Sequence, residues 1–280
     1  MSTSKNTFEN PQVESNSIEV LSMKLLQATD QLTKANKELS EKHKALAESE
    51  RQRKEMLANI SHDLRAPITA IRSSLDLLSS YDDLPAEEVK NAVGLINRRV
   101  ATLESLIQDM YFLFCVEDDT RSFSLESVEL APFLESYFYD AIVDSRYDNH
   151  DMQLDIPMDL SGRITIDIQK TIRVLDNLFT NAAKYSGEGS TITLCAKTSG
   201  NLAIISVSDT GVGIPSDALA HIFDRTYTVS SSRSPGSTTG SGLGLAIVKA
   251  VIEKQNGTVR CESEINKGSS FIIELPLVAD

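Results

Sequence analysis

The feature that most restricts how this chain can fold is a long run of apolar residues spaced alternately three and four apart. The run begins at Ile18 and continues through Leu21, Leu25, Ala28, Leu32, Ala35 and Leu39. Such a heptad seam is typical of a helix that pairs with a second helix in a coiled coil. The seam then takes up Lys42, Ser49 and Arg53, which weaken the pairing and leave it adjustable. We predict a parallel two-stranded coiled coil, with a surface helix as the alternative.

A helical hairpin is predicted directly after this seam. The helical pattern continues through His62 to about Tyr81, and Pro67 inside it removes one backbone donor. A turn at 82–85 leads into a second amphipathic helix. Its apolar stripe consists of Val89, Val93, Ile96, Val100, Leu103, Ile107 and Met110. One hairpin cannot cover its own apolar face, whereas two hairpins from separate chains form a four-helix bundle, so the pattern predicts a homodimer.

From about Asp118 the chain changes to mixed helix and strand. Helices are predicted at Pro132–Ser145, Ile168–Tyr185 and Leu243–Gln255. Strands are predicted at Ser124–Leu130, Gln153–Ile156, Arg163–Ile166, Thr191–Lys197, Leu202–Ser208, Thr258–Glu264 and Ser269–Leu275. The segment Ser230–Gly242 is rich in Ser, Thr, Gly and Pro, and we predict a mobile loop there.

Composition narrows the classes of function. The formal net charge of −13 over 280 residues argues against nucleic acid or an anionic membrane as the main partner, because both attract basic surfaces. Cys115, Cys195 and Cys261 are far apart and odd in number, so no disulfide framework is expected. No apolar run approaches the roughly 20 residues of a membrane-spanning helix, and no signal peptide is visible. The sequence therefore indicates a cytoplasmic protein without a membrane span.

A candidate nucleophile lies on the first helix of the hairpin. In the segment 59–67, His62 is followed at once by Asp63. A carboxylate that accepts one imidazole N–H fixes the tautomer and leaves the other ring nitrogen free to attack. The alternative is solvated polar surface, and the dipeptide alone does not decide between the two.

The segment 176–186 offers groups that suit a phosphorylated ligand. Asn177 and Asn181 are four residues apart, so they share one face of a helix. Amide oxygens are hard ligands of the kind that Mg²⁺ accepts, and Lys184 can offset phosphate charge. The alternative is an ordinary polar stripe on a helix.

Two glycine-rich segments complete the set. Asp209 ends an apolar strand and can accept a hydrogen bond from an exocyclic amine, while Gly211 and Gly213 let the backbone approach a flat ligand. The segment 240–245 leads straight into a helix, whose N-terminal N–H groups hold phosphate oxygens well. Its spacing differs from that of a Walker loop or a dinucleotide fingerprint. The alternative for each segment is a turn that opens the next helix.

In this order, the segments resemble the motifs of the bacterial sensor histidine kinases. The His62 segment resembles the phosphoacceptor box. The other four matches are 177–186 to the N box, 209–215 to the G1 box, 222–225 to the F box and 240–245 to the G2 box. The resemblance implies a multidomain α and α+β fold. A coiled coil and a dimeric four-helix bundle would precede a two-layer α/β sandwich that binds ATP, of the type shared with gyrase.

The resemblance also gives expected domain boundaries. We expect a disordered tail at 1–16 and a coiled-coil signalling helix at 17–55. The dimerisation and histidine phosphotransfer hairpin would follow at 56–117, and the catalytic ATP-binding domain at 118–280.

Residue roles follow from the resemblance. His62 would be the phosphoacceptor, and Asp63 its hydrogen-bond partner and base. Asn181 would hold Mg²⁺, Asn177 would assist at the phosphates, and Asp209 would bind the adenine amine. The other residues expected to bind the cofactor are Lys184, Tyr185, Gly211, Gly213, Ile214, Arg225, Gly240, Gly242, Leu243 and Gly244, with the last glycines hinging a lid.

The implied activity is a histidine kinase that phosphorylates His62 from Mg-ATP. It would pass the phosphoryl group to an aspartate in the receiver domain of a response regulator. Many relatives carry Thr or Asn where this chain has Ala66, so we expect no efficient phosphatase activity. Thr226 and Thr228 depart from the usual pattern after the F box and remove a phosphate-side cation. No sensor domain is visible, so we expect the signal to come from a separate sensor protein at the coiled coil.

Two other classes of function stay open. One is a kinase-dead adaptor that binds ATP or a regulator and signals by conformation. The other is an ATP-binding protein that phosphorylates a serine, as anti-sigma kinases of this fold do. The hairpin with His62 counts against the second. Asn181, Asp209 and the lid glycines count against the first.

Overall fold

The computed structural model describes residues 11–80, 85–118, 122–225, 227 and 242–278. Of some residues between 11 and 63, His62 and Asp63 among them, it describes only the backbone. The chain divides into two compact units, Met1–Ala58 and Asn59–Asp280, and each is described by itself.

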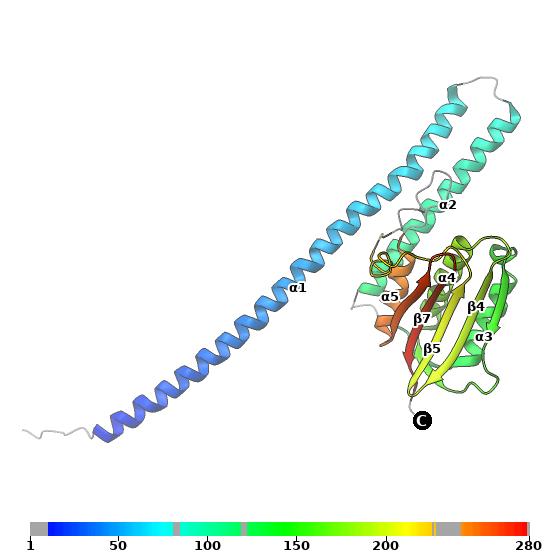
Figure 1. The fold of residues 1–280 in the computed structure, drawn as a ribbon. Helices are drawn as coiled ribbons and strands as arrows, with labels where there is room; N and C mark the ends of the chain where they lie inside the picture. Colours follow the sequence, from blue (N-terminus) through cyan, green and yellow to red (C-terminus); the bar gives the residue numbers. More distant parts are fainter. Residues whose placement is uncertain (1–10, 81–84, 119–121, 226, 228–241, 279–280) are drawn as a thin grey trace, which may run out of the picture. The chain divides into compact units, whose positions relative to one another are not determined.

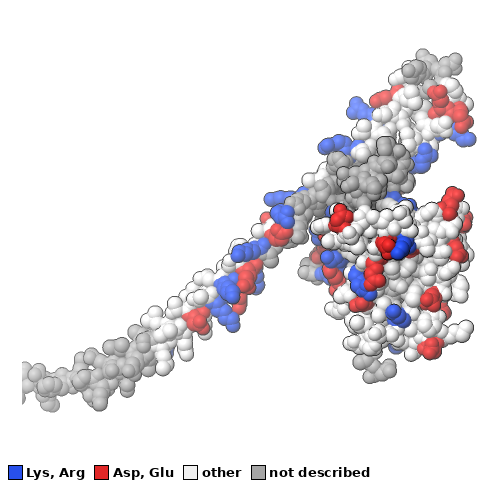
Figure 2. All heavy atoms as spheres, in the orientation of Figure 1, with Lys and Arg blue, Asp and Glu red and all other residues white. Residues whose placement is uncertain are grey.

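Helix α1 (Pro11–Ser80) supplies the first unit and continues into the second. It begins at Pro11, where the missing N–H costs little because first-turn donors have no partner within the helix. Residues 11–16, which we predicted to be disordered, are therefore helical. Four leucines recur every seven residues and are 55–63% exposed: Leu25, Leu32, Leu39 and Leu46. Acidic and basic side chains are interspersed along the same helix (Figure 2).

The second unit opens with the predicted helical hairpin. The end of α1 is followed by α2 (Ala86–Glu117), whose first turn carries Glu87 and Glu88, favourable at the positive end of the helix dipole. The turn itself, at 81–84, lies outside the described residues. Several apolar side chains of the two helices are 39–53% exposed: Ile68, Leu75, Val93, Val100 and Ile107. The hairpin therefore has an apolar surface that one chain does not cover.

The C-terminal half of α2 packs against the remainder of the second unit. Leu106, Leu113 and Val116 are buried, and α2 contacts α5 (Gly244–Lys254). The Arg173 guanidinium donates to Asp109 of α2. This half of α2 is therefore part of the same packed unit as the sheet and its helices.

The core of the second unit is a five-stranded sheet. Its strands, in spatial order, are β2 (Asp151–Asp155), β4 (Thr191–Ser199), β5 (Leu202–Asp209), β7 (Gly268–Pro276) and β6 (Thr258–Glu264). Strands β2 and β4 are parallel, and the other neighbours are antiparallel. A separate antiparallel pair is formed by β1 (Glu126–Glu129) and β3 (Arg163–Ile166). Burial alternates along β5, so the sheet turns one face toward the helices.

Three helices form the second layer (Figure 1). They are α3 (Leu130–Ile142), α4 (Ile168–Tyr185) and α5, with a short 3-10 helix η1 (Ser145–Tyr147) after α3. Leu178, Phe179 and Ile247 of these helices are completely buried. The predicted two-layer α/β sandwich is confirmed.

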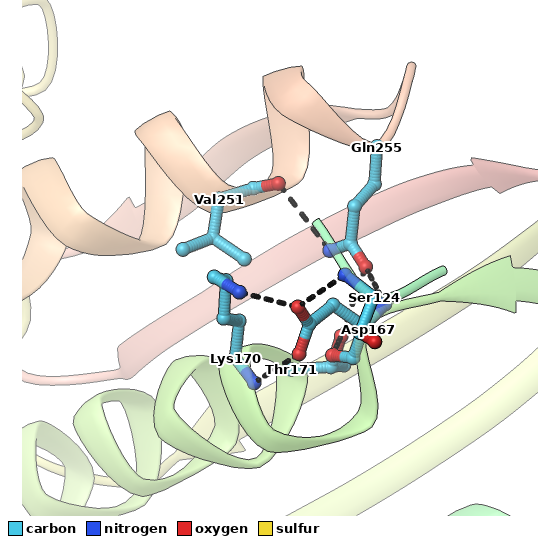
Figure 3. Close-up of polar contacts among 6 residues, drawn as sticks. All are labelled: Ser124, Asp167, Lys170, Thr171, Val251 and Gln255. Atoms are coloured by element: carbon cyan, nitrogen blue, oxygen red, sulfur yellow. Dashed lines mark hydrogen bonds and ion pairs between the residues drawn. The ribbon is translucent and has the colours of Figure 1, made fainter. Parts of the chain in front are cut away.

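A buried polar cluster fixes one end of the α4–α5 pair (Figure 3). The Asp167 carboxylate caps α4 by accepting from the Lys170 N–H, and it also accepts from the Ser124 N–H and the Lys170 ammonium. Gln255, at the C-terminus of α5, accepts from the Asp167 N–H at 2.7 Å and from the Thr171 hydroxyl at 3.2 Å. The start of α4 is thereby tied to the end of α5, so the two helices run antiparallel.

Candidate functional site

Helix α4 carries two asparagines along one edge of its core-facing stripe. Val174, Leu178 and Ala182 are buried, while Asn177 and Asn181, four residues apart, are half-buried. The Asn177 Nδ2 atom is buried and has no hydrogen-bond partner among the described residues. An unsatisfied buried amide costs free energy, so this nitrogen is poised to donate to a ligand.

The amide group of Asn177 lies with its oxygen beside the N-terminus of α5. A Cβ added to Gly244, the first residue of α5, would be 3.3 Å from the Asn177 Oδ1. The first N–H groups of an α-helix have no acceptor within the helix, and the helix dipole makes this end attractive to anions. Leu243, at the N-cap, is buried and anchors the end of the helix. The amide and the helix end together suit phosphate oxygens.

Asp209 is an acceptor at the end of β5. Only 8% of its surface is exposed, and its Oδ1 accepts from the Gly211 N–H at 2.8 Å. Burial raises the pKa of Asp209, and the backbone N–H groups of Gly211 and Ser269 oppose this rise. An isolated, buried carboxylate that retains free lone pairs can accept a hydrogen bond from an amine.

The two glycines after Asp209 are required by the chain itself. A Cβ on Gly211 would lie 2.3 Å from the Tyr185 carbonyl oxygen, where the loop meets the end of α4. Gly213 has φ +69, and its Cβ would lie 2.1 Å from the Glu264 carbonyl oxygen. From the sequence, we predicted that these glycines allow close approach of a ligand. The structure shows that they allow close approach of two backbone segments.

Other predicted residues lie around the same site. The Lys184 ammonium is 4.9 Å from the ring centroid of Tyr185, at the end of α4. Ile214 is half-buried, and its N–H donates to the Ser263 hydroxyl at 2.8 Å. Gly242 precedes α5 with φ +65. The end of the N box therefore meets the G1 box at Tyr185, whose carbonyl oxygen accepts from the Val212 N–H at 3.1 Å.

Three predicted residues cannot be placed in this site. The backbone of His62 and Asp63 is helical within α1, but their side chains lie outside the description, as does all of Gly240. The predicted loop Ser230–Gly242 also falls outside the described residues up to 241.

Arg225 makes a contact that the sequence analysis did not foresee. Its guanidinium donates to Glu117 at the end of α2. Burial raises the pKa of Glu117, and the charges of Arg225 and Lys254 oppose the rise. This contact lies beside α5, at the hairpin, whereas we predicted a role at the cofactor.

Ser263 and Ser269, which no sequence motif indicated, support the loop after Asp209. Ser269 is paired with Asp209 across the β5–β7 ladder and with Ser263 across the β6–β7 ladder. The Ser263 hydroxyl donates to the Gly268 carbonyl oxygen at 2.8 Å. These serines come next to Asp209 through strand register, so no local motif could have revealed them.

The site thus combines an acceptor for an amine with donors for an anion. Asp209 supplies the acceptor, and Asn177 with the N-terminus of α5 supplies the donors. A nucleotide is a ligand with both requirements. Together with the two-layer sandwich and the hairpin, these features define a nucleotide-binding domain attached to a helical hairpin.

Comparison with known protein families agrees with this class. Residues 166–279 match the model of the histidine kinase-, DNA gyrase B- and HSP90-like ATPases. Residues 52–118 match the model of the histidine kinase A phospho-acceptor domain. The chain therefore belongs to the two-component sensor histidine kinases.

Individual relatives support the same family. The chain is 32% identical over 238 residues to the sensor protein DivL of Caulobacter vibrioides, covering 85% of this chain and 30% of DivL. The structure of full-length ShkA in complex with AMPPNP matches with a TM-score of 0.57 and 27% identity, over 81% of this chain and 46% of ShkA.

The histidine kinase ThkA in complex with the response regulator TrrA matches with a TM-score of 0.65 and 23% identity, over 80% of this chain and 61% of ThkA. At that identity the match shows the fold alone. The chain spans between 30% and 50% of the length of the curated relatives that it matches first. Among the described residues, no helix is both long and apolar enough to cross a membrane.

Proposed function

We propose that this chain is a protein-histidine kinase that phosphorylates its own His62 from Mg-ATP. The observation that carries the proposal is the buried, unpartnered Asn177 amide beside the N-terminus of α5. Among the described residues, the amide nitrogen of Asn177 has no hydrogen-bond partner, so it can donate to a ligand there. Residue 62 lies in the segment that matches the phospho-acceptor model.

The chemistry asks little of the protein beyond position and charge. One imidazole nitrogen of His62 would attack the γ-phosphorus, and the bond from that phosphorus to the β–γ bridging oxygen would break, releasing ADP. The Asp63 carboxylate would accept the other imidazole N–H and stabilise its positive charge. Transfer of this kind depends on alignment and on neutralising phosphate oxygens.

Bound Mg²⁺ would neutralise phosphate charge in this reaction. Asn181 shares its helix face with Asn177 and offers an amide oxygen, a hard ligand of the kind that Mg²⁺ takes alongside phosphates and water. Asn181→Ala should therefore remove most Mg-dependent activity. Asn201→Ala, in an exposed turn, is the matched control and should leave the activity unchanged.

The acceptor and the assembly follow from the same proposal. The phosphoryl group would pass from His62 to an aspartate of a response regulator receiver domain, as the family and the ThkA complex suggest.

Two copies of the hairpin would cover the exposed apolar residues of α1 and α2 in a homodimer. Light scattering should show a dimer in solution, and a monomer would contradict this assembly. A separate sensor protein at the leucine row of α1 would supply the signal.

The direct test is incubation with γ-labelled ATP and Mg²⁺. We expect label that is lost in acid and survives alkali, as phosphohistidine does. His62→Gln should remove the label, whereas His43→Gln, an exposed histidine elsewhere on α1, should keep it. Full labelling of His62→Gln would contradict the assignment. No label with ATP still bound would favour the kinase-dead adaptor.

A further inference from the structure

A cavity lies on a different side of α4 from the nucleotide groups. It has a volume of about 310 Å³, is open to solvent, and is lined by residues of α3, η1 with its N-cap, and the first half of α4. This volume is at the lower limit of small-molecule sites in proteins. None of the residues proposed to bind ATP lines it.

The helix geometry separates this cavity from the nucleotide site. Ile172 and Asp176 line the cavity, and each precedes Asn177 or Asn181 by five residues. Five residues correspond to about 140° around an α-helix. The two sites therefore lie on different sides of α4.

The charges around the cavity are mostly negative. Asp140, Asp144 and Asp176 line it, and Arg146 is the one basic residue in its lining. Arg146 forms an ion pair with Asp144, in which Nη2 and Nε donate to the same carboxylate oxygen at 2.7 Å and 2.9 Å. The cavity therefore keeps an excess of two carboxylates, from Asp140 and Asp176.

Aromatic rings form the apolar part of the wall. The Arg146 guanidinium lies over the ring of Tyr147, 5.3 Å from its centroid. A cation on an aromatic face beside a carboxylate is a recurring way to hold a guanidinium or an ammonium group. The cavity therefore already holds one such cation of the chain itself at its edge.

Two phenol groups complete the lining. The Tyr137 hydroxyl donates to Asp176 Oδ1 at 3.1 Å. Tyr147 is only 2% exposed, and its hydroxyl lies beside the Thr180 side chain. Burial raises the pKa of Tyr147, with the Thr180 hydroxyl opposing the rise, so the phenol stays protonated at neutral pH.

We propose that this cavity is a second ligand site, for a small organic cation. The ligand would carry a protonated amine, amidine or guanidine on a compact apolar body. Asp140 and Asp176 would bind the charge, and the rings of Tyr137 and Tyr147 would contact the body. The site is independent of the proposed kinase reaction, since it shares no residue with the nucleotide site.

Benzamidine is a suitable probe, because it joins an amidinium to one ring. We expect saturable binding to the full chain by calorimetry, at one site per chain, with benzamide, its neutral counterpart, at least about tenfold weaker. Asp176→Asn and Asp140→Asn should each weaken benzamidine binding by about fivefold or more.

The matched control is Glu135→Gln, which removes the same charge from an exposed position of α3 outside the cavity lining. It should leave the benzamidine affinity unchanged. Thermal unfolding of each variant checks that the fold is retained. Equal affinity for benzamide, equal loss in Glu135→Gln, or no saturable binding at about 10 mM benzamidine would overturn the proposal.

Discussion

The two ends of the α4–α5 helix pair are built from similar polar residues but differ in how these residues are satisfied. At one end, the Asp167 carboxylate and the Gln255 amide are buried and hydrogen-bonded to the backbone and side chains around them (Figure 3). At the other end, the Asn177 Nδ2 is buried and has no hydrogen-bond partner among the described residues. Asp209 is buried as well, and its pKa is shifted by burial and by backbone N–H groups, not by a basic side chain.

The difference separates structural polar groups from binding groups. A buried polar residue that is fully paired stabilises the fold, whereas an unpaired one lowers stability unless a ligand completes it. The pKa values point the same way. Burial alone would raise the pKa of Asp167, but hydrogen bonds from Lys170 and Ser124 outweigh it and lower the pKa. Burial raises the pKa of Asp209.

The largest expected effect is on stability, at the paired end. Asp167→Ala removes the cap of α4 and the partner of the Lys170 ammonium, so the free energy of unfolding should fall by about 2–4 kcal/mol. Urea unfolding measures this, and the folded protein should keep its ATP affinity. Asp159→Ala, at an exposed position, should stay within about 0.5 kcal/mol. A large loss of ATP affinity in folded Asp167→Ala would break the comparison.

The next effect is on ligand binding, at the unpaired end. Asp209→Asn should weaken ATP binding by about 10–100-fold, because the adenine amine loses a charged acceptor. Removing a buried carboxylate that the fold does not neutralise should leave the urea midpoint unchanged or raise it. Asp217→Asn, which changes an exposed acid nearby, is the control for net charge. Lower stability with unchanged affinity would reverse the roles of the two ends.

The two ends should respond to acid at different pH values, because Asp167 and Asp209 have pKa values shifted in opposite directions. The stabilising effect of Asp167 is complete above the unfolded pKa of about 3.9 and is lost as the pH falls through its lower folded pKa. The pKa of Asp209 is raised, so ionisation costs stability at neutral pH. Asp209 should therefore be protonated at a higher pH than Asp167, and its charged acceptor then becomes a weaker, neutral one.

ATP affinity should therefore fall at a higher pH than stability does. Calorimetry and urea unfolding across the acid range measure the two curves. Asp209→Asn should lack the step in affinity that Asp209 causes. A single step shared by affinity and stability would show that one group governs both.

The smallest expected effect comes from Gly244→Ala. The added methyl group would contact Asn177 Oδ1, which must move by a few tenths of an ångström. We expect ATP affinity to fall by about three- to tenfold, roughly 0.7–1.4 kcal/mol, with little change in stability. Gly187→Ala is the matched control, since an added Cβ there meets nothing within 4 Å. Unchanged affinity in Gly244→Ala would place the phosphates elsewhere.

The sequence predicted those elements whose signals are local. Helix α4 has the predicted bounds, because its apolar stripe is regular and Asp167 marks its start. Strand β6 also agrees residue for residue. Helix α3 was predicted to start at Pro132 but starts at Leu130, because the third residue of a helix needs no N–H partner within it.

The candidate site was predictable only as far as its motifs reach. Asn177, Asn181 and Asp209 were identified from spacing and neighbours, and the structure brings their segments together. Ser269 meets Asp209 only through strand register, and the cavity beside α4 joins acidic residues of three different elements. Contacts between distant segments leave no periodic pattern in the sequence.

Hydrogen exchange with and without Mg²⁺ and a non-hydrolysable ATP analogue tests the central claim most directly. At short labelling times, which report local opening, the amides at 211–214 and 244–247 should exchange more slowly with the nucleotide. The amides of Ser124 and Lys170, at the paired end, should not change. Two results would contradict the assignment of the unpaired end as the nucleotide site. One is slower exchange at Asp167 and its neighbours when the nucleotide is bound, and the other is an unchanged exchange rate at 244–247.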